Sequence, residues 1–316
     1  MAPIPVQKVD ISQTPAQPPQ NQESVSGSAG SVPSPQDRAP LGANYYLTEG
    51  LEGVKAQHYR GTQSFITAIN LQADQLRSGD AGQYAVFSQV TQDELANIEC
   101  FRNIHYKSLR FLYYEYEQTL IVKIMLSAVH ELACTAFEAA LIVKLAEMGL
   151  YTQLGNVRSA TFQGILSRKE VDSAFKPPLS RPNKTDWPTL VIECGVSESI
   201  ACLRIDSAWW LENSGGQVKT VLLFSVSESK RKIHIEQWEI CSVPNLQDTR
   251  DHPNTTRTGP GSIHTIDIIA TDAAGASLEL NFEKLFHHKP GKGEKDIIFT
   301  TQDLEIYADH VWGCAQ

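Results

Sequence analysis

The stretch over residues 168–226 constrains the fold of this chain more than any other part of it. It contains a short run that ends at Asp172, a proline-rich loop, an apolar β-branched run that ends at Glu193, a helical segment over residues 197–213 and a second apolar run over residues 218–226. Strand, loop, strand, helix and strand in this order are typical of an α/β fold.

The chain on either side of this stretch adds elements of both kinds. We expect a helix over residues 92–102, because Thr91 and Glu94 have the spacing of a capping box. A longer helix over residues 128–148 begins where Ser127 can cap it. The remaining predicted elements are strands over residues 108–116, 118–125, 160–166, 171–175, 232–240, 262–270 and 277–282, a loop over 245–261 and a helix over 303–311. Together they predict an α/β fold.

Composition divides the chain into three parts. Residues 1–44 are rich in proline, glutamine, serine and glycine, and such a segment cannot bury enough apolar surface to offset its ordering entropy, so we expect a disordered tail. We expect a helical lead-in over residues 45–104 and the main domain over residues 105–316. The hydrophobic fraction, 41%, fits a normal core diluted by a polar tail.

Charge and hydropathy narrow the possible partners and compartments. The net charge of -9 argues against broad, non-specific binding to nucleic acid, although it leaves room for a local basic groove. No apolar run reaches about 18 residues, so we expect no membrane span. The first residues lack the pattern of a secretory signal, which favours an intracellular protein of the cytoplasm or nucleus. The six cysteines form no CxxC pair, and we therefore expect reduced thiols and no structural zinc site.

Three acidic residues are the strongest candidates for chemistry. Asp172 and Glu193 stand at the ends of neighbouring predicted strands, and Glu131 lies in the first turn of the predicted helix over residues 128–148. Carboxylates gathered at strand ends are a common way to hold a divalent cation. Each also has a simpler interpretation. Glu131 could complement the helix dipole, Asp172 could belong to a turn, and Glu193 could form a structural ion pair with Arg204 or Lys219.

Five segments around these acids carry a resemblance to a known family: TLIVKIMLSAVHE (119–131), KEVDSAFKP (169–177), WPTLVIECGVSES (187–199), LRIDSAWWLENSGGQVKTVLL (203–223) and IHIEQWE (233–239). In these segments the chain resembles fungal restriction-endonuclease-like proteins of the PD-(D/E)XK superfamily, close to the Uma2-like branch. The resemblance spans roughly residues 105–312. It implies a restriction-endonuclease-like core, with a mixed central sheet flanked by helices, that hydrolyses phosphodiester bonds with Mg²⁺ or Mn²⁺.

The resemblance implies that Glu131, Asp172 and Glu193 bind the metal. The chain departs from the family pattern in two places. Val171 stands where the family has proline, and Gly195 stands where it has its catalytic lysine. A glycine cannot stabilise the transition state. The missing positive charge would then come from Arg204 on the following helix or from Lys219 on the next strand.

Two functions of different classes follow from this pattern. One is a metal-dependent nuclease, with nucleic acid as its partner. The other is a catalytically inactive binding or scaffold protein that retains the core, which Gly195 and the acidic net charge favour. An accessory role in a fungal pathway is a third, less supported hypothesis. We expect Trp209 and Trp210 to be core residues rather than a base-stacking platform, and His130 to be structural rather than a metal ligand.

Overall fold

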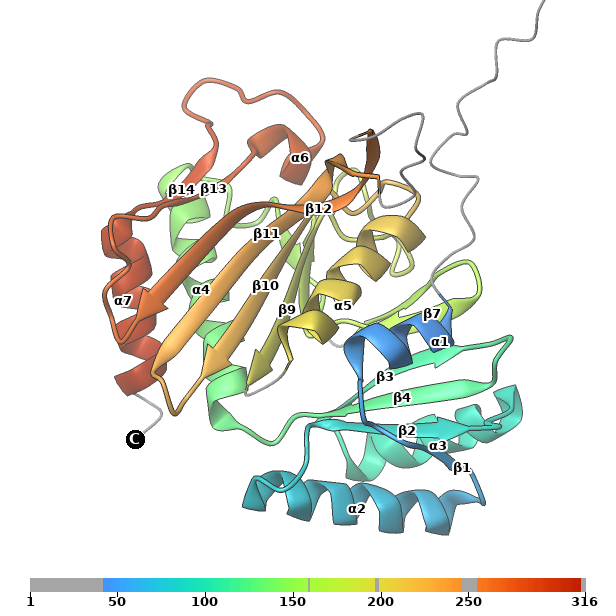
Figure 1. Ribbon diagram of the computed structural model, residues 1–316. Helices are drawn as coiled ribbons and strands as arrows, with labels where there is room; N and C mark the ends of the chain where they lie inside the picture. Colours follow the sequence, from blue (N-terminus) through green and yellow to red (C-terminus); the bar gives the residue numbers. More distant parts are fainter. Residues whose placement is uncertain (1–41, 159, 197–198, 246–254, 314–316) are drawn as a thin grey trace, which may run out of the picture. The chain divides into compact units, whose positions relative to one another are not determined.

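The structure, a computed structural model, describes residues 42–158, 160–196, 199–245 and 255–313 (Figure 1). The tail expected over residues 1–44 lies almost entirely outside these residues. The described residues belong to one compact unit. None of the described helices is long and apolar enough to cross a membrane.

The helices fall where capping residues and apolar periodicity place them. The capping box of Thr91 and Glu94 forms as expected and begins α3. Ser127 caps α4, and Gly149 follows that helix with a positive φ of 74°. The helical elements are α1 (Ala43–Tyr45), the π-helical turn η2 (Tyr46–Gly50), α2 (Thr62–Ser78), α3 (Gln92–His105), α4 (Ala128–Glu147), α5 (Ile200–Asn213), α6 (Phe282–Phe286) and α7 (Thr301–Gly313).

The first six-stranded sheet has the order β1-β2-β4-β3-β7-β6. Its strands are β1 (Ala56–His58), β2 (Tyr84–Ser88), β3 (Leu109–Tyr114), β4 (Thr119–Ile124), β6 (Thr161–Gln163) and β7 (Ser167–Glu170). The predicted hairpin of β3 and β4 is confirmed. The lead-in was expected to be helical, but β1 and β2 pair within this sheet, β2 directly with β4.

The second six-stranded sheet has the order β12-β11-β10-β9-β8-β5, with β9 and β10 parallel and the other neighbours antiparallel. Its strands are β5 (Gly155–Asn156), β8 (Ser173–Lys176), β9 (Leu190–Val196), β10 (Thr220–Ser227), β11 (Lys232–Pro244) and β12 (Thr256–Ile269). A small sheet pairs β13 (Leu278–Leu280) with β14 (Ile297–Phe299). The mixed α/β class is therefore confirmed, whereas the loop expected over residues 245–261 is wrong from Thr256 onward, where β12 begins.

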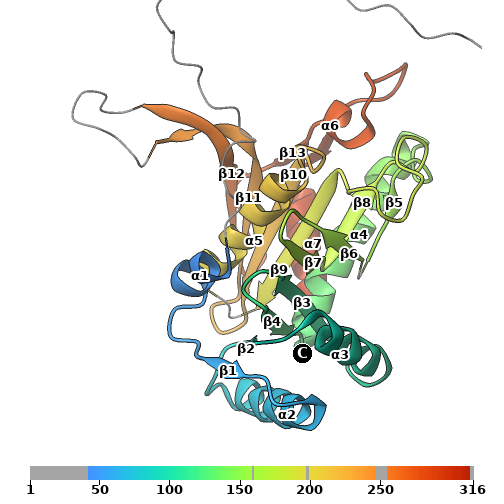
Figure 2. The same cartoon turned by 90° about the vertical axis from the view of Figure 1, so that its right-hand side faces the viewer.

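Helices cover both faces of the second sheet (Figures 1 and 2). On one face α4 and α7 share a core with Ile192 of β9, and on the other α5 shares a core with Val191. Successive residues of a strand point to opposite faces, so Glu193 faces α5 and Cys194 faces α4. The helices α2 and α3 pack on the first sheet around a third core. Trp209 and Trp210 of α5 are buried, as expected.

Candidate functional site

The two central acids occupy the place where the chain passes from one sheet to the other. Ser167–Glu170 form β7 in the first sheet and Ser173–Lys176 form β8 in the second, with Asp172 in the short connection between them. Glu193 lies within β9, next to β8. The side chains of Asp172 and Glu193 are each only 1% exposed. Two buried carboxylates in one region need compensating charge.

Lys123 supplies much of that charge. It lies on β4 of the first sheet, and its Nζ is 2.8 Å from Asp172 Oδ2 and 3.8 Å from Glu193 Oε2. The same ammonium donates a hydrogen bond of 2.7 Å to the backbone carbonyl of Cys194. The backbone N–H of Cys194 donates to Asp172 Oδ2 at 3.1 Å. These contacts fix the ammonium between the two acids.

A second lysine and a third acid extend the network toward α5. Lys169 Nζ lies 2.5 Å from Asp206 Oδ1 and 3.7 Å from Glu193 Oε1. The Tyr46 hydroxyl donates to the same Asp206 oxygen at 2.7 Å. Trp210 Nε1 donates to Glu193 Oε1 at 2.5 Å. The sequence alone predicts none of these pairings.

Burial and charge act in opposite directions on the two central acids. Burial is the main cause that raises the pKa of Glu193 to about 8, and the nearby Asp172 adds to it while Lys169 opposes it. Burial also tends to raise the pKa of Asp172, but Lys123 and His130 hold that pKa well below its ordinary value. Asp172 is therefore the anionic member of the pair, and Glu193 is mostly protonated at neutral pH.

His130, at the start of α4, contacts the same acid from the other side. Its Nε2 is 3.0 Å from the Cys194 carbonyl and 3.4 Å from Asp172 Oδ2. Burial tends to lower the pKa of His130, but Cys194 and Asp172 together raise it to about 9. These contacts hold the ring in a fixed orientation.

The other residues expected at the site lie away from this network. Glu131 is exposed on the surface of α4, and among the described residues the structure does not bring it together with Asp172 and Glu193 in one group of metal ligands. The reason is helical geometry: His130 and Glu131 are consecutive, so they point in different directions, and it is His130 that reaches Asp172.

Arg204 and Lys219 also have other partners. The guanidinium of Arg204 binds the buried carboxylate of Glu236 on β11, with its Nη2 2.5 Å from Oε1. Burial tends to raise the pKa of Glu236, but hydrogen bonds from His234, Arg204 and Trp238 lower it to about 2. The Lys219 ammonium donates to the Gly216 carbonyl at 2.6 Å. The alternative interpretation of Glu193 as the ionic partner of Arg204 or Lys219 is therefore wrong; its cationic partners are lysines of the first sheet.

The lysines of the network carried a signal in the sequence. Lys123 interrupts the apolar run TLIVKIM, and Lys169 stands three residues before Asp172. A lysine that the alternation of a buried strand directs inward requires an acid as partner. Which acid it meets depends on how two sheets approach each other, and local sequence does not contain that information.

A cavity of about 10 Å³ lies beside the network, and Lys123, Lys169, Asp172, Glu193 and Tyr46 are among the residues that line it. This is space for about one water molecule. Among the described residues, no hydrogen-bond partner reaches Asp172 Oδ1. Two carboxylates, one of them with an oxygen that no hydrogen bond occupies, are ligands of the kind that a hard divalent cation prefers. The cavity, however, is too small for the several water molecules that Mg²⁺ retains. Loading the site would require its cover to move.

Comparisons with known proteins add little to this description. No model of a known protein family matches the chain, and no curated protein matches it. A solved structure from Anabaena variabilis, described as a candidate nuclease of DUF820, is similar over 63% of this chain and 90% of that chain. The two share 10% sequence identity with a TM-score of 0.36. A likeness at this level shows neither a family nor an activity, so the function has to be argued from the site itself.

Proposed function

We propose that this protein is a metal-dependent nuclease whose site is formed by Asp172, Glu193 and Lys123. A single observation carries the proposal. Lys123 Nζ lies 2.8 Å from Asp172 Oδ2 and 3.8 Å from Glu193 Oε2, so a lysine lies close to both acids. This lysine is not at the motif position, where the chain has Gly195. The positive charge comes from β4, a different strand from the one that the motif uses.

Each residue has a distinct role in this proposal. Hydrolysis of a phosphodiester breaks one P–O bond, forms another to water, and builds negative charge on the phosphoryl oxygens as it does so. The Lys123 ammonium, which the Cys194 carbonyl and Asp172 hold in place, is oriented to stabilise that charge. Asp172 remains anionic, and Glu193, with a pKa of about 8, would release its proton when it binds the metal.

Asp172 and Glu193 are the residues that would hold the divalent metal, Mg²⁺ or Mn²⁺. The free Oδ1 of Asp172 supports this assignment. When bound, such an ion supplies an activated water and neutralises phosphoryl charge. Glu131 is exposed and takes no part in this version of the site.

Substrate access requires a change of conformation. Tyr46 of η2 lines the cavity and donates a hydrogen bond to Asp206. Figure 2 shows α1, which leads directly into η2, lying against α5. Active sites that close over their chemistry commonly open through movement of a short segment of this kind. In this proposal the segment over residues 43–50 is the cover.

The proposal is tested by incubating the full chain with plasmid DNA, single-stranded DNA and RNA in the presence of Mg²⁺ or Mn²⁺. We expect cleavage that stops on addition of a chelator and is lost in Glu193→Gln. Gln retains the shape of the side chain, and circular dichroism checks that the variant folds. Glu239→Gln, a change of another buried glutamate in the same sheet, is the matched control and should cleave normally. Absence of cleavage across the panel would refute the nuclease.

An inactive binding or scaffold protein is the second candidate, and one observation favours it. Asp172 and Glu193 already have Lys123 as an ionic partner, and Asp206 has Lys169, all with side chains at most 7% exposed. A buried network with this balance of charge does not need a metal. The inactive protein would show no rise in melting temperature with Mg²⁺, whereas a rise that Glu193→Gln abolishes would count against it.

A further inference from the structure

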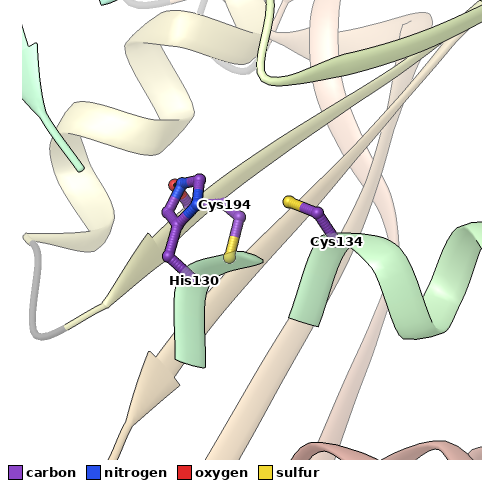
Figure 3. A group of neighbouring side chains, drawn as sticks. All are labelled: His130, Cys134 and Cys194. Atoms are coloured by element: carbon purple, nitrogen blue, oxygen red, sulfur yellow. The ribbon is translucent and has the colours of Figure 1, made fainter. Parts of the chain in front are cut away.

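A second group of side chains lies on the opposite face of β9 from Glu193. His130 and Cys134 are four residues apart on α4, so both project from the same side of that helix. Cys194 projects toward them from β9, and its thiol is hydrogen-bonded to that of Cys134. One ring nitrogen and the two Sγ atoms lie within 4.8 Å of one another, and all three residues are buried. Figure 3 shows the imidazole and both thiols around one shared space.

The orientation of His130 leaves one ring nitrogen available. Its Nε2 is 3.0 Å from the Cys194 carbonyl and 3.4 Å from the Asp172 carboxylate, which places the donated proton on Nε2. Nδ1 is buried and has no hydrogen-bond partner among the described residues. A histidine that binds a metal typically donates its other N–H to a carbonyl or a carboxylate. His130 is therefore oriented as a ligand is, and an ion bound at Nδ1 would displace the proton that this nitrogen carries at neutral pH.

The two faces of β9 differ in the kind of cation that they suit. The face of Glu193 offers carboxylates that lysines already neutralise. The face of Cys194 offers two thiols and an imidazole, which soft or borderline cations prefer. Two thiolates would also balance the charge of a divalent ion, so its binding would add no net charge to the buried interior.

We propose that His130, Cys134 and Cys194 form a binding site for one thiophilic divalent cation, with zinc as the favoured ion. The set of two cysteines and one histidine leaves a fourth position for water or another small ligand. The ion would tie the start of α4 to the middle of β9, directly behind the acids of the proposed nuclease site. The site does not depend on nuclease activity.

The experiment uses the full chain, reduced and stripped of metal by a chelator. Zinc is titrated against a chromophoric chelator, and cobalt is then added as a spectroscopic substitute. We expect one zinc per chain, a thiolate-to-cobalt charge-transfer band and the strong visible bands of a tetrahedral site. X-ray absorption of the zinc-bound wild-type chain should show two sulfur ligands and one imidazole. This measurement uses the wild-type chain, so its result does not depend on whether a variant folds.

Single substitutions then assign the ligands. Cys134→Ala should weaken zinc binding by more than the roughly 10–100-fold that is typical of a residue that only supports a ligand. Cys202→Ala, which removes a buried thiol outside the group, is the matched control and should bind zinc as the wild type does. Failure of the folded wild-type chain to bind zinc, a bound ion with no sulfur ligand, or unchanged affinity in Cys134→Ala would each overturn the proposal.

Discussion

Replacing Lys123 with methionine tests the energetics of the buried network. Methionine keeps an unbranched stem of similar length but removes the ammonium. Asp172 then loses its cation at 2.8 Å, and the Cys194 carbonyl loses a hydrogen bond of 2.7 Å. With side chains 5% and 1% exposed, water cannot replace either contact without a rearrangement. We expect Lys123→Met to lower the free energy of unfolding by about 3–5 kcal/mol at neutral pH, the range for breaking a buried ion pair from one side.

The assay is urea denaturation at neutral pH, followed by circular dichroism and by tryptophan fluorescence. Lys232→Met is the matched control, because the pair of Lys232 and Asp267 has side chains that are 35% and 47% exposed. That substitution should cost at most about 1 kcal/mol. The double variant Lys123→Met/Asp172→Asn should recover part of the loss, since it no longer leaves a buried carboxylate without its cation.

A loss below about 1 kcal/mol for Lys123→Met, equal to that of the control, would refute this reasoning. It would mean that the charges of the interior are not stabilised by one another. A loss of the expected size with no recovery in the double variant would show that Lys123 acts through the Cys194 carbonyl rather than through Asp172.

Three further predictions concern other parts of the chain. Arg204→Met should destabilise the protein by on the order of 1 kcal/mol at neutral pH. The pKa of Glu236 is lowered from 4.5 to about 2, so the stabilisation by the ionised Glu236 is complete above pH 4.5 and is lost as the pH falls toward 2. The loss of unfolding free energy caused by Arg204→Met, measured by denaturation, should therefore shrink between pH 4.5 and pH 2. Trp210→Phe removes the hydrogen bond of 2.5 Å to Glu193, and thermal unfolding should show a loss of about 1–3 kcal/mol. Thr91→Ala should cost about 1 kcal/mol through the lost helix cap, and an equal midpoint to the wild type in denaturant would contradict this.

Local patterns were sufficient to predict much of the fold. Caps at Thr91 and Ser127 and the alternation of β11 follow from interactions within a few residues, and the corresponding elements were predicted correctly. The strand β2 and the helix α6 were not predicted. Each is five residues long, and so short an element depends on its neighbours rather than on its own periodicity.

The composition of the site was harder to predict than the fold. Asp172 and Glu193 stand out in the sequence because each ends a short predicted run, and the run before Glu193 is apolar. Their partner Lys123 is 49 residues before Asp172 and belongs to the other sheet. The proximity of His130, Cys134 and Cys194 was not predicted from the sequence for the same reason. Its thiols do not form a CxxC pair and meet only when α4 packs on β9.

The rate of phosphodiester cleavage by Lys123→Met, with Lys232→Met beside it, tests most directly whether a lysine from β4 replaces the one missing at Gly195. At saturating Mg²⁺, and under conditions in which circular dichroism shows both variants folded, Lys123→Met should cleave at least about 100-fold more slowly than the wild type. Lys232→Met should cleave at the wild-type rate. Equal rates for wild type and Lys123→Met would contradict the account.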